Sequence, residues 1–216
     1  MFMDFYETVN KVGVVPVVVI EDKADAIATA KALIEGGINF MEITLRTPCA
    51  LEAIELVSRN VPDMIVGAGT VLNRDAAERA VEAGAKFIVS PGFFPDVVDY
   101  CQEISLPVIP GCVTPTEINS AINKGIKTVK FFPADVYGGI KSIKELSSVF
   151  SDVKFLPTGG INAANMAQYI SEPFIIAVGG SWVCSKKMIN SHDYEGIADN
   201  AKQATEIIRS LKENAA

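Results

Sequence analysis

The sequence has 216 residues, of which 49% are hydrophobic, and this suits one folded domain with a large core. Its 19 basic and 26 acidic residues give a formal charge of −7 without a cluster of Lys or Arg, which excludes nucleic acid and anionic membrane surfaces as expected partners. The apolar run that stops at Glu21 is too short to cross a bilayer, and no signal peptide is evident, so we expect a soluble cytoplasmic protein.

One unit recurs along the chain: a short apolar run, a polar turn, and a segment in which Ala, Ile and Leu recur at three- and four-residue steps. Residues 22–37, 73–85 and 114–125 are such helical segments, and they start with an Asp, Asn or Thr that can cap a helix. Residues 4–12 predict an added helix before the first strand, and residues 193–214 predict a closing helix. The expected strands are Val14–Ile20, Phe40–Leu45, Met64–Gly67, Phe87–Val89, Pro107–Pro110, Thr128–Phe132, Lys154–Pro157 and Phe174–Val178.

Apolar strands that alternate with helices are typical of parallel βα units, because a parallel pair needs a crossover connection. Eight such units predict an α/β fold of the (β/α)8 TIM barrel type with an added N-terminal helix. No linker interrupts the pattern, so we expect residues 1–216 to form a single domain. A doubly wound open sheet is the alternative, because periodicity does not show whether the last strand pairs with the first.

Three polar residues alternate along the second expected strand. Glu42, Thr44 and Arg46 would share one face, since strand side chains point alternately to opposite sides. A barrel interior is normally filled by branched apolar side chains, so this polar set favours a ligand site. The alternative is a buried Glu–Arg pair with a purely structural role.

The segment TVKFFPA places Lys130 within an expected buried strand, on the same face as Thr128 and Phe132. Desolvation favours the neutral amine of a lysine, and a neutral amine can attack a ketone to form a Schiff base. Lys86 and Lys154 also adjoin expected strands. They stand at strand starts, however, and the C-terminal ends of strands carry the reactive groups of such barrels, so we favour Lys130.

Two diglycine pairs lie near the last two expected strands, in PTGGIN and VGGSW. We expect both pairs to form turns, and turns at these positions are the usual phosphate site of such barrels, because glycine lets backbone N–H groups approach an anion. The alternative is a helix stop or a tight turn without a ligand.

The remaining motifs predict neither a metal nor a cofactor. VGAGTV lacks the spacing of the GxGxxG dinucleotide fingerprint. The four cysteines are scattered without a CxxC pair, and we expect them to be reduced, buried side chains. The one histidine, His192, cannot supply the usual ligand set of zinc or iron, and we expect it in a surface loop.

The segments EITLRT, VGAGTV, SPG, KFFPA, PTGGI and GGSW, in this order, resemble the bacterial 2-keto-3-deoxy-6-phosphogluconate (KDPG) and 4-hydroxy-2-oxoglutarate (KHG) aldolases. The resemblance spans about Val14 to Val183. It implies a metal-independent class I aldolase of the (β/α)8 type that assembles as a homotrimer. The implied reactions are the reversible cleavage of KDPG to pyruvate and glyceraldehyde 3-phosphate, and of KHG to pyruvate and glyoxylate.

The resemblance also implies roles for individual residues. Lys130 forms the Schiff base, Glu42 is the general acid and base, and Arg46 and Thr70 hold the substrate carboxylate. The other implied substrate-binding residues are Pro91 and Phe132 at the pyruvate pocket, Thr158 beside them, and Gly159, Gly160, Gly180 and Ser181 in the phosphate-binding turns.

One position departs from the family pattern. Some members carry an arginine at the end of the first strand, where this chain reads PVVVIED without a basic residue. The alternatives are an aldolase for an epimeric substrate such as the phosphogalactonate analogue, a phosphate-binding barrel isomerase or synthase, and a barrel without catalytic activity.

Overall fold

The computed structural model describes residues 2–213, in which parallel strands alternate with helices. The strands are β1 (Val14–Val18), β2 (Phe40–Thr44), β3 (Ile65–Gly69), β4 (Ile88–Val89), β5 (Val108–Ile109), β6 (Thr128–Phe131), β7 (Lys154–Pro157) and β8 (Val178–Gly180). The helices are α1 (Phe2–Val12), α2 (Asp25–Glu35), α3 (Ala50–Asn60), α4 (Arg74–Glu82), α5 (Pro95–Glu103), α6 (Pro115–Asn123), α7 (Gly139–Val149), α8 (Met166–Ile170), α9 (Lys186–Asn190) and α10 (Tyr194–Glu213).

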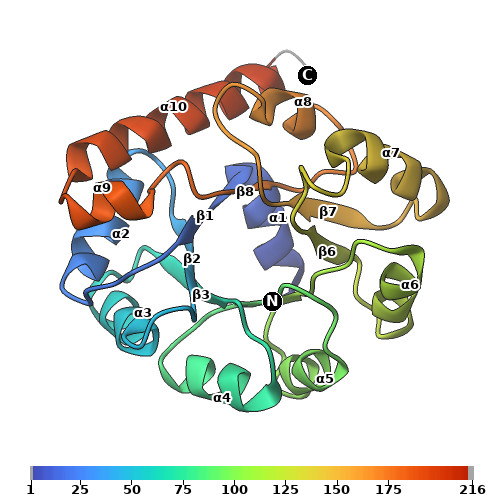
Figure 1. Ribbon diagram of the computed structural model, residues 1–216, viewed down its shortest axis with the longest axis horizontal. Helices are drawn as coiled ribbons and strands as arrows, with labels where there is room; N and C mark the ends of the chain where they lie inside the picture. Colours follow the sequence, from blue (N-terminus) through green and yellow to red (C-terminus); the bar gives the residue numbers. More distant parts are fainter. Residues whose placement is uncertain (1, 214–216) are drawn as a thin grey trace.

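The strands form a curled parallel sheet. Six strands pair in the order β5-β4-β3-β2-β1-β8, and β6 pairs with β7. Isolated bridges join Gly111 to Lys130 and Thr158 to Gly179, which connects the two sets of strands. Figure 1 shows the strands around a central axis, with α2 to α10 on the outside and α1 at the centre of the view. The predicted α/β class is therefore confirmed, with a curled sheet that resembles a TIM-type barrel.

The last strand lies later in the chain than the sequence predicts. We expected Phe174–Val178, but β8 covers Val178–Gly180. Its register explains the shift, because β1 starts at Val14, and Val14 pairs with Val178. Residues 175–177 are buried like a strand, and their apolar character alone suggested one.

Helix starts agree with the sequence at two of three predicted caps. The Asn73 side chain accepts a hydrogen bond from the Ala76 N–H at 2.9 Å, and Thr114 forms a capping box with Glu117 at α6. The predicted Asp cap of α2 is wrong, because Ala24 is at the cap position. Asp22, two residues before the cap position, instead accepts a hydrogen bond from the Ala24 N–H.

Two apolar cores lie on the two faces of the curled sheet. The larger one lies between the strands and the outer helices, and the smaller one lies inside the curl. Helix α1 covers one end of the inner core, where the Phe5 ring lies 5.8 Å from Phe40 and 5.3 Å from Phe87, measured between ring centroids. The base of the curl is therefore filled by apolar side chains, which leaves the opposite end for polar groups.

The cysteine and histidine predictions agree with the structure. Cys101, Cys112 and Cys184 are buried, Cys49 is partly buried, and all four are free thiols. His192 is exposed in the turn between α9 and α10. Among residues 2–213, no helix is long and apolar enough to cross a membrane, and no group of three or more His, Cys, Asp and Glu side chains is arranged to hold a metal.

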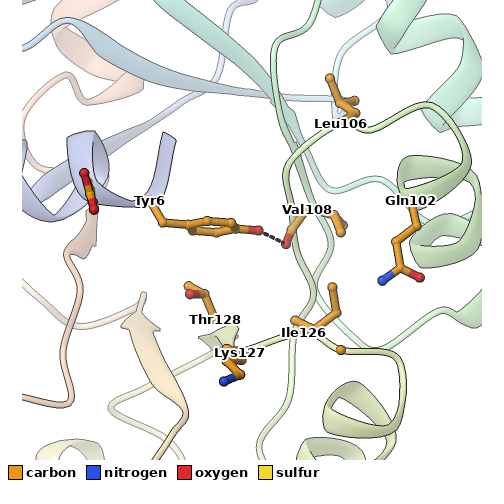
Figure 2. Close-up of a pocket in the computed structure, with 9 residues that line it drawn as sticks. Tyr6, Gln102, Leu106, Val108, Ile126, Lys127 and Thr128 are labelled. Carbon is orange, nitrogen blue, oxygen red and sulfur yellow. Dashed lines mark hydrogen bonds between the residues drawn. The ribbon is translucent and has the colours of Figure 1, made fainter. Parts of the chain in front are cut away.

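Tyr6 of α1 makes a specific polar contact at the base of the curl. Its hydroxyl donates a hydrogen bond of 3.1 Å to the carbonyl of Val108 in β5 (Figure 2). Burial raises the pKa of Tyr6 to about 12. The contact connects α1 to β5, which has only two residues and therefore few hydrogen bonds to its neighbouring strands.

Replacing Tyr6 with Phe should lower the free energy of unfolding by about 1–2 kcal/mol at neutral pH, since the buried Val108 carbonyl loses its donor. The wild-type protein should also lose stability as the pH rises from about 10 toward 12, because the unfolded tyrosine ionises near its ordinary pKa while the folded one stays protonated. The Phe variant should lack this component. Urea unfolding at pH 7, 10 and 11 measures both effects, and equal losses in the exposed control Tyr137→Phe would contradict the assignment.

Candidate functional site

A buried ion pair crosses the interior of the curled sheet. Lys130 on β6 is 5% exposed, and Glu42 on β2 is fully buried. The Lys130 Nζ lies 3.1 Å from Oε1 and 3.4 Å from Oε2 of Glu42. The two strands are not neighbours in the sheet, so this contact exists only because the sheet curls and brings β6 opposite β2.

The structure distinguishes Lys130 from its two rivals. Lys86 and Lys154 are exposed at the starts of their strands, and the Lys154 amine donates to the Pro173 carbonyl. A buried ion pair is weak evidence for stability, because desolvation of both ions offsets their attraction. The burial of this lysine is therefore better explained by chemistry than by folding.

The backbone holds Lys130 in a fixed place. Its N–H donates to the Pro110 carbonyl at 2.8 Å, and its own carbonyl accepts from the Cys112 N–H at 2.8 Å. The Phe132 ring centroid lies 5.5 Å from Nζ, within the range of a cation–π contact. The Lys130 amine therefore lies between the Glu42 carboxylate and the Phe132 ring, with little access to solvent.

Glycine at position 69 makes room for Glu42, and the sequence reasoning missed this residue. Gly69 lies on β3 beside β2, and a Cβ there would overlap the Glu42 Oε1 and lie 2.6 Å from Cδ and Cγ. Gly67 has a similar role against the Phe87 ring. The signal was present in VGAGTV, where two glycines at a spacing of two point to the same side of a strand.

The predicted polar face of the second strand is correct for two of its three residues. Glu42 and Thr44 are buried in β2, and the Thr44 hydroxyl donates to the Val18 carbonyl at 3.2 Å. Arg46 does not extend this buried face. The strand ends at Thr44, a turn follows in which the Arg46 N–H donates to the Thr44 carbonyl at 2.8 Å, and the Arg46 side chain is exposed.

Arg46 instead contacts the residue that follows β3. Its Nε donates to the Thr70 hydroxyl at 3.2 Å. Thr70 has a φ of 59°, a left-handed conformation that is uncommon for a β-branched residue. The resemblance pairs these two residues in one role, and the structure brings them together at the C-terminal ends of adjacent strands.

The first diglycine forms a turn after β7. Gly159 and Gly160 have φ values of 101° and 71°, which favour glycine. A Cβ on Gly159 would lie 3.2 Å from the Pro133 Cα, and one on Gly160 would overlap the Asp135 side chain. The turn is therefore packed against the segment that directly follows Lys130.

Thr158, at the start of this turn, has a hydroxyl without a hydrogen-bond partner among the described residues. Its side chain is 6% exposed, so the hydroxyl also has little access to solvent. A buried hydroxyl normally has a partner. The hydroxyl faces Gly179 of β8, where a Cβ would overlap it, so Gly179 makes room for Thr158 inside the sheet.

The second diglycine does not form the predicted turn. Gly179 and Gly180 lie within β8, paired with Val15 and Pro16 of β1. A Cβ on Gly180 would overlap the Trp182 ring, which gives this glycine a packing role. Ser181, which follows β8, is exposed and is the first residue of the connection to α9.

Pro91 follows β4 and is partly buried. Gly111 lies against it, since a Cβ on Gly111 would overlap the Pro91 carbonyl. The same Gly111 forms the bridge to Lys130, so the segment at Pro91 is connected to β6 through one glycine. Every predicted site residue lies on one of the strands β2–β4 or β6–β8, or within three residues after its end.

The chain matches a known family model. The model described as KDPG and KHG aldolase covers residues 6–200. The chain belongs to this family. The chain is also similar to the 2-dehydro-3-deoxy-phosphogluconate aldolase of Treponema pallidum, with 42% identity over 203 residues, which cover 94% of this chain and 97% of the relative.

Solved structures of KDPG aldolases share the fold. The enzyme of Legionella pneumophila, captured with pyruvate as a covalent carbinolamine intermediate at low pH, matches with a TM-score of 0.89 and 39% identity over 92% of this chain and 97% of that chain. The enzyme of Zymomonas mobilis ZM4 with 3-phosphoglycerate matches with a TM-score of 0.87 and 42% identity over 94% and 96%.

Replacing Gly69 with Ala should destabilise the protein by about 1–3 kcal/mol, because the new methyl group displaces the Glu42 carboxylate. The same substitution in a Glu42→Ala background should cost much less, since the overlapping atoms are gone. Urea unfolding of the wild type, both single variants and the double variant gives the coupling free energy. Additive effects would show that Gly69 has a different packing role.

Proposed function

We propose that the protein is a class I aldolase that cleaves KDPG to pyruvate and glyceraldehyde 3-phosphate, and KHG to pyruvate and glyoxylate. The observation that supports this most directly is the buried Lys130 amine, 3.1 Å from the Glu42 carboxylate. Membership of the KDPG and KHG aldolase family favours this reaction over the isomerase, synthase and inactive-barrel alternatives.

The first step is the attack of the Lys130 amine on the C2 ketone. An ammonium is not a nucleophile, so Lys130 adds as the neutral amine, and the proton that it releases returns to the carbinolamine hydroxyl, which leaves as water. The addition gives a carbinolamine, and loss of water then gives a protonated imine. The imine draws electrons from C3 and prepares the C3–C4 bond for cleavage.

Glu42 then acts as the general base for this cleavage. It takes the proton of the C4 hydroxyl, the C4–O bond becomes the aldehyde carbonyl, and the electrons of the C3–C4 bond pass to the imine to form an enamine. Return of a proton to C3 regenerates an imine, and water releases pyruvate from Lys130. A fully buried carboxylate beside the lysine suits both proton transfers.

Arg46 and Thr70 bind the substrate carboxylate in this proposal. Their hydrogen bond at the ends of β2 and β3 holds the guanidinium near the mouth, where a carboxylate can receive two charge-assisted bonds. Phe132 and Pro91 provide apolar contacts around the pyruvate carbons. The Phe132 ring already lies against the Lys130 amine.

The phosphate of the substrate binds at the turn after β7 and the end of β8. Gly159 and Gly160 offer backbone N–H groups, Gly180 and Ser181 lie at the end of the neighbouring strand, and Thr158 has an unpaired hydroxyl. The end of β1 contributes no cation. Glu21 lies there, and hydrogen bonds from Lys186 and Asn190, 2.7 Å each, hold its pKa below the ordinary value.

We further infer the organisation of the whole molecule. The bridges between the two sets of strands support a closed (β/α)8 barrel with α1 as an added helix, and the shared cores support a single domain over residues 2–213. Residues 1 and 214–216 of the predicted domain lie outside the described part. A homotrimer in the cytoplasm, without a metal or cofactor, stays a prediction from the sequence.

Sodium borohydride should trap pyruvate on Lys130, because reduction converts the imine to a stable amine. Peptide mass spectrometry should place the adduct on the peptide that contains Lys130, and the Lys130→Met variant should lose it. Lys86→Met and Lys154→Met, which remove exposed lysines at strand starts, should keep it. An adduct on Lys86 or Lys154 would overturn the assignment.

Replacing Glu42 with Gln should lower the turnover of KDPG cleavage by about 10²–10⁴-fold, since the amide cannot accept the hydroxyl proton. Imine trapping with pyruvate should be largely retained, because the lysine keeps its place on β6. A pyruvate-release assay measures turnover, and Glu145→Gln on exposed α7 is the matched control. Loss of trapping in Glu42→Gln would show that Glu42 acts earlier, at imine formation.

A further inference from the structure

A second hollow lies at the opposite end of the curl from the mouth. It has a volume of about 580 Å³ and lies between α1 and the starts of β5 and β6. Tyr6, Val108 and Ile126 line it in Figure 2, and Leu106 lies above them. Its volume is within the range of small-molecule sites, which is about 300–1,000 Å³.

The hollow exists because β5 and β6 separate below the active site. The two strands belong to different sheets, and the bridge that joins their segments is at Gly111 and Lys130, beyond the end of β5. Nearer the base, the Val108 carbonyl accepts a hydrogen bond from the Tyr6 hydroxyl. Gly125 adds open space, because a Cβ there would have no neighbour within 4 Å.

The walls and the rim differ in chemistry. The walls are the apolar side chains named above, and the rim carries two opposite charges, Glu7 of α1 and Lys127 before β6. Both charged side chains are exposed, and neither forms an ion pair within residues 2–213. A ligand with one net charge would meet one attractive and one repulsive group, whereas a zwitterion would meet two attractive groups.

We propose that this hollow binds an α-amino acid with an aromatic or large apolar side chain. The side chain packs on Tyr6, Leu106 and Ile126, the carboxylate pairs with Lys127, and the ammonium pairs with Glu7. The site is separate from the proposed aldolase site and its occupancy does not depend on that chemistry.

Occupancy of the hollow acts on Lys130 through β6. Thr128 lines the hollow, and Lys130 lies two residues further on the same face of the same strand, about 6.6 Å along the chain. A ligand between β5 and β6 displaces β6 and moves the Lys130 amine from its place, so the ligand slows imine formation.

Titration calorimetry with L-phenylalanine as the probe tests the site. We expect a dissociation constant of about 1 mM or tighter, and binding at least about tenfold weaker for 3-phenylpropionate and for phenethylamine, which each lack one charge. Absence of heat with L-phenylalanine, or equal binding of all three compounds, would overturn the proposal.

Variants at the rim identify the location. Lys127→Met and Glu7→Gln should each weaken binding about fivefold or more. The matched controls are Lys86→Met, another exposed lysine before a strand, and Glu35→Gln, an exposed glutamate at a helix end, and neither should change binding. Equal loss in a control and its partner variant would place the ligand elsewhere.

The coupling to Lys130 has its own readout, which rests on the proposed function. Saturating L-phenylalanine should slow borohydride trapping of pyruvate at least about twofold in the wild type and leave it unchanged in Lys127→Met. Failure of trapping in the absence of L-phenylalanine would count against the aldolase. Normal trapping that L-phenylalanine does not slow would overturn the coupling alone.

Discussion

The contact between Lys130 and Glu42 depends on the shape of the whole sheet. The two residues are 88 positions apart, lie on strands that do not pair, and meet only across the interior of the curl. Removing one partner of a buried pair typically costs about 3–5 kcal/mol, because the other charge is then left uncompensated. The neighbouring strand makes room for the pair with Gly69, so three strands contribute to one contact.

The interior of the curl is divided along its axis. At the base, Phe5, Phe40 and Phe87 exclude water under α1. Toward the C-terminal ends of the strands, the interior becomes polar at Glu42 and Lys130. The charged pair therefore lies between the apolar base and the polar residues Arg46 and Thr70 at the C-terminal ends of the strands.

Sequence reasoning predicted the α/β fold class and the buried strand position of Lys130, because both depend on local patterns. The recurrence of strand and helix is visible in the residues. Lys130 lies within an apolar run, whereas Lys86 and Lys154 stand at the starts of theirs. The register of β8 was not visible, since the buried run before Val178 has the same composition as a strand. The end of β2 was also missed, and with it the exposed position of Arg46. The sequence keeps alternating polar and apolar residues up to Arg46, although the strand ends at Thr44 and a turn follows. Gly69 was overlooked because its role is defined by a side chain on another strand.

Thr70 combines a strained backbone conformation with a side-chain hydrogen bond to Arg46. A threonine with a φ of 59° carries strain on the order of 1–3 kcal/mol, and glycine would relieve it. Glycine would also remove the hydroxyl that accepts the hydrogen bond from the Arg46 Nε. In the proposed aldolase, where Arg46 and Thr70 bind the substrate carboxylate, selection for heat tolerance alone should therefore favour glycine at this position and weaken keto-acid binding, whereas selection under limiting keto acid should retain the threonine.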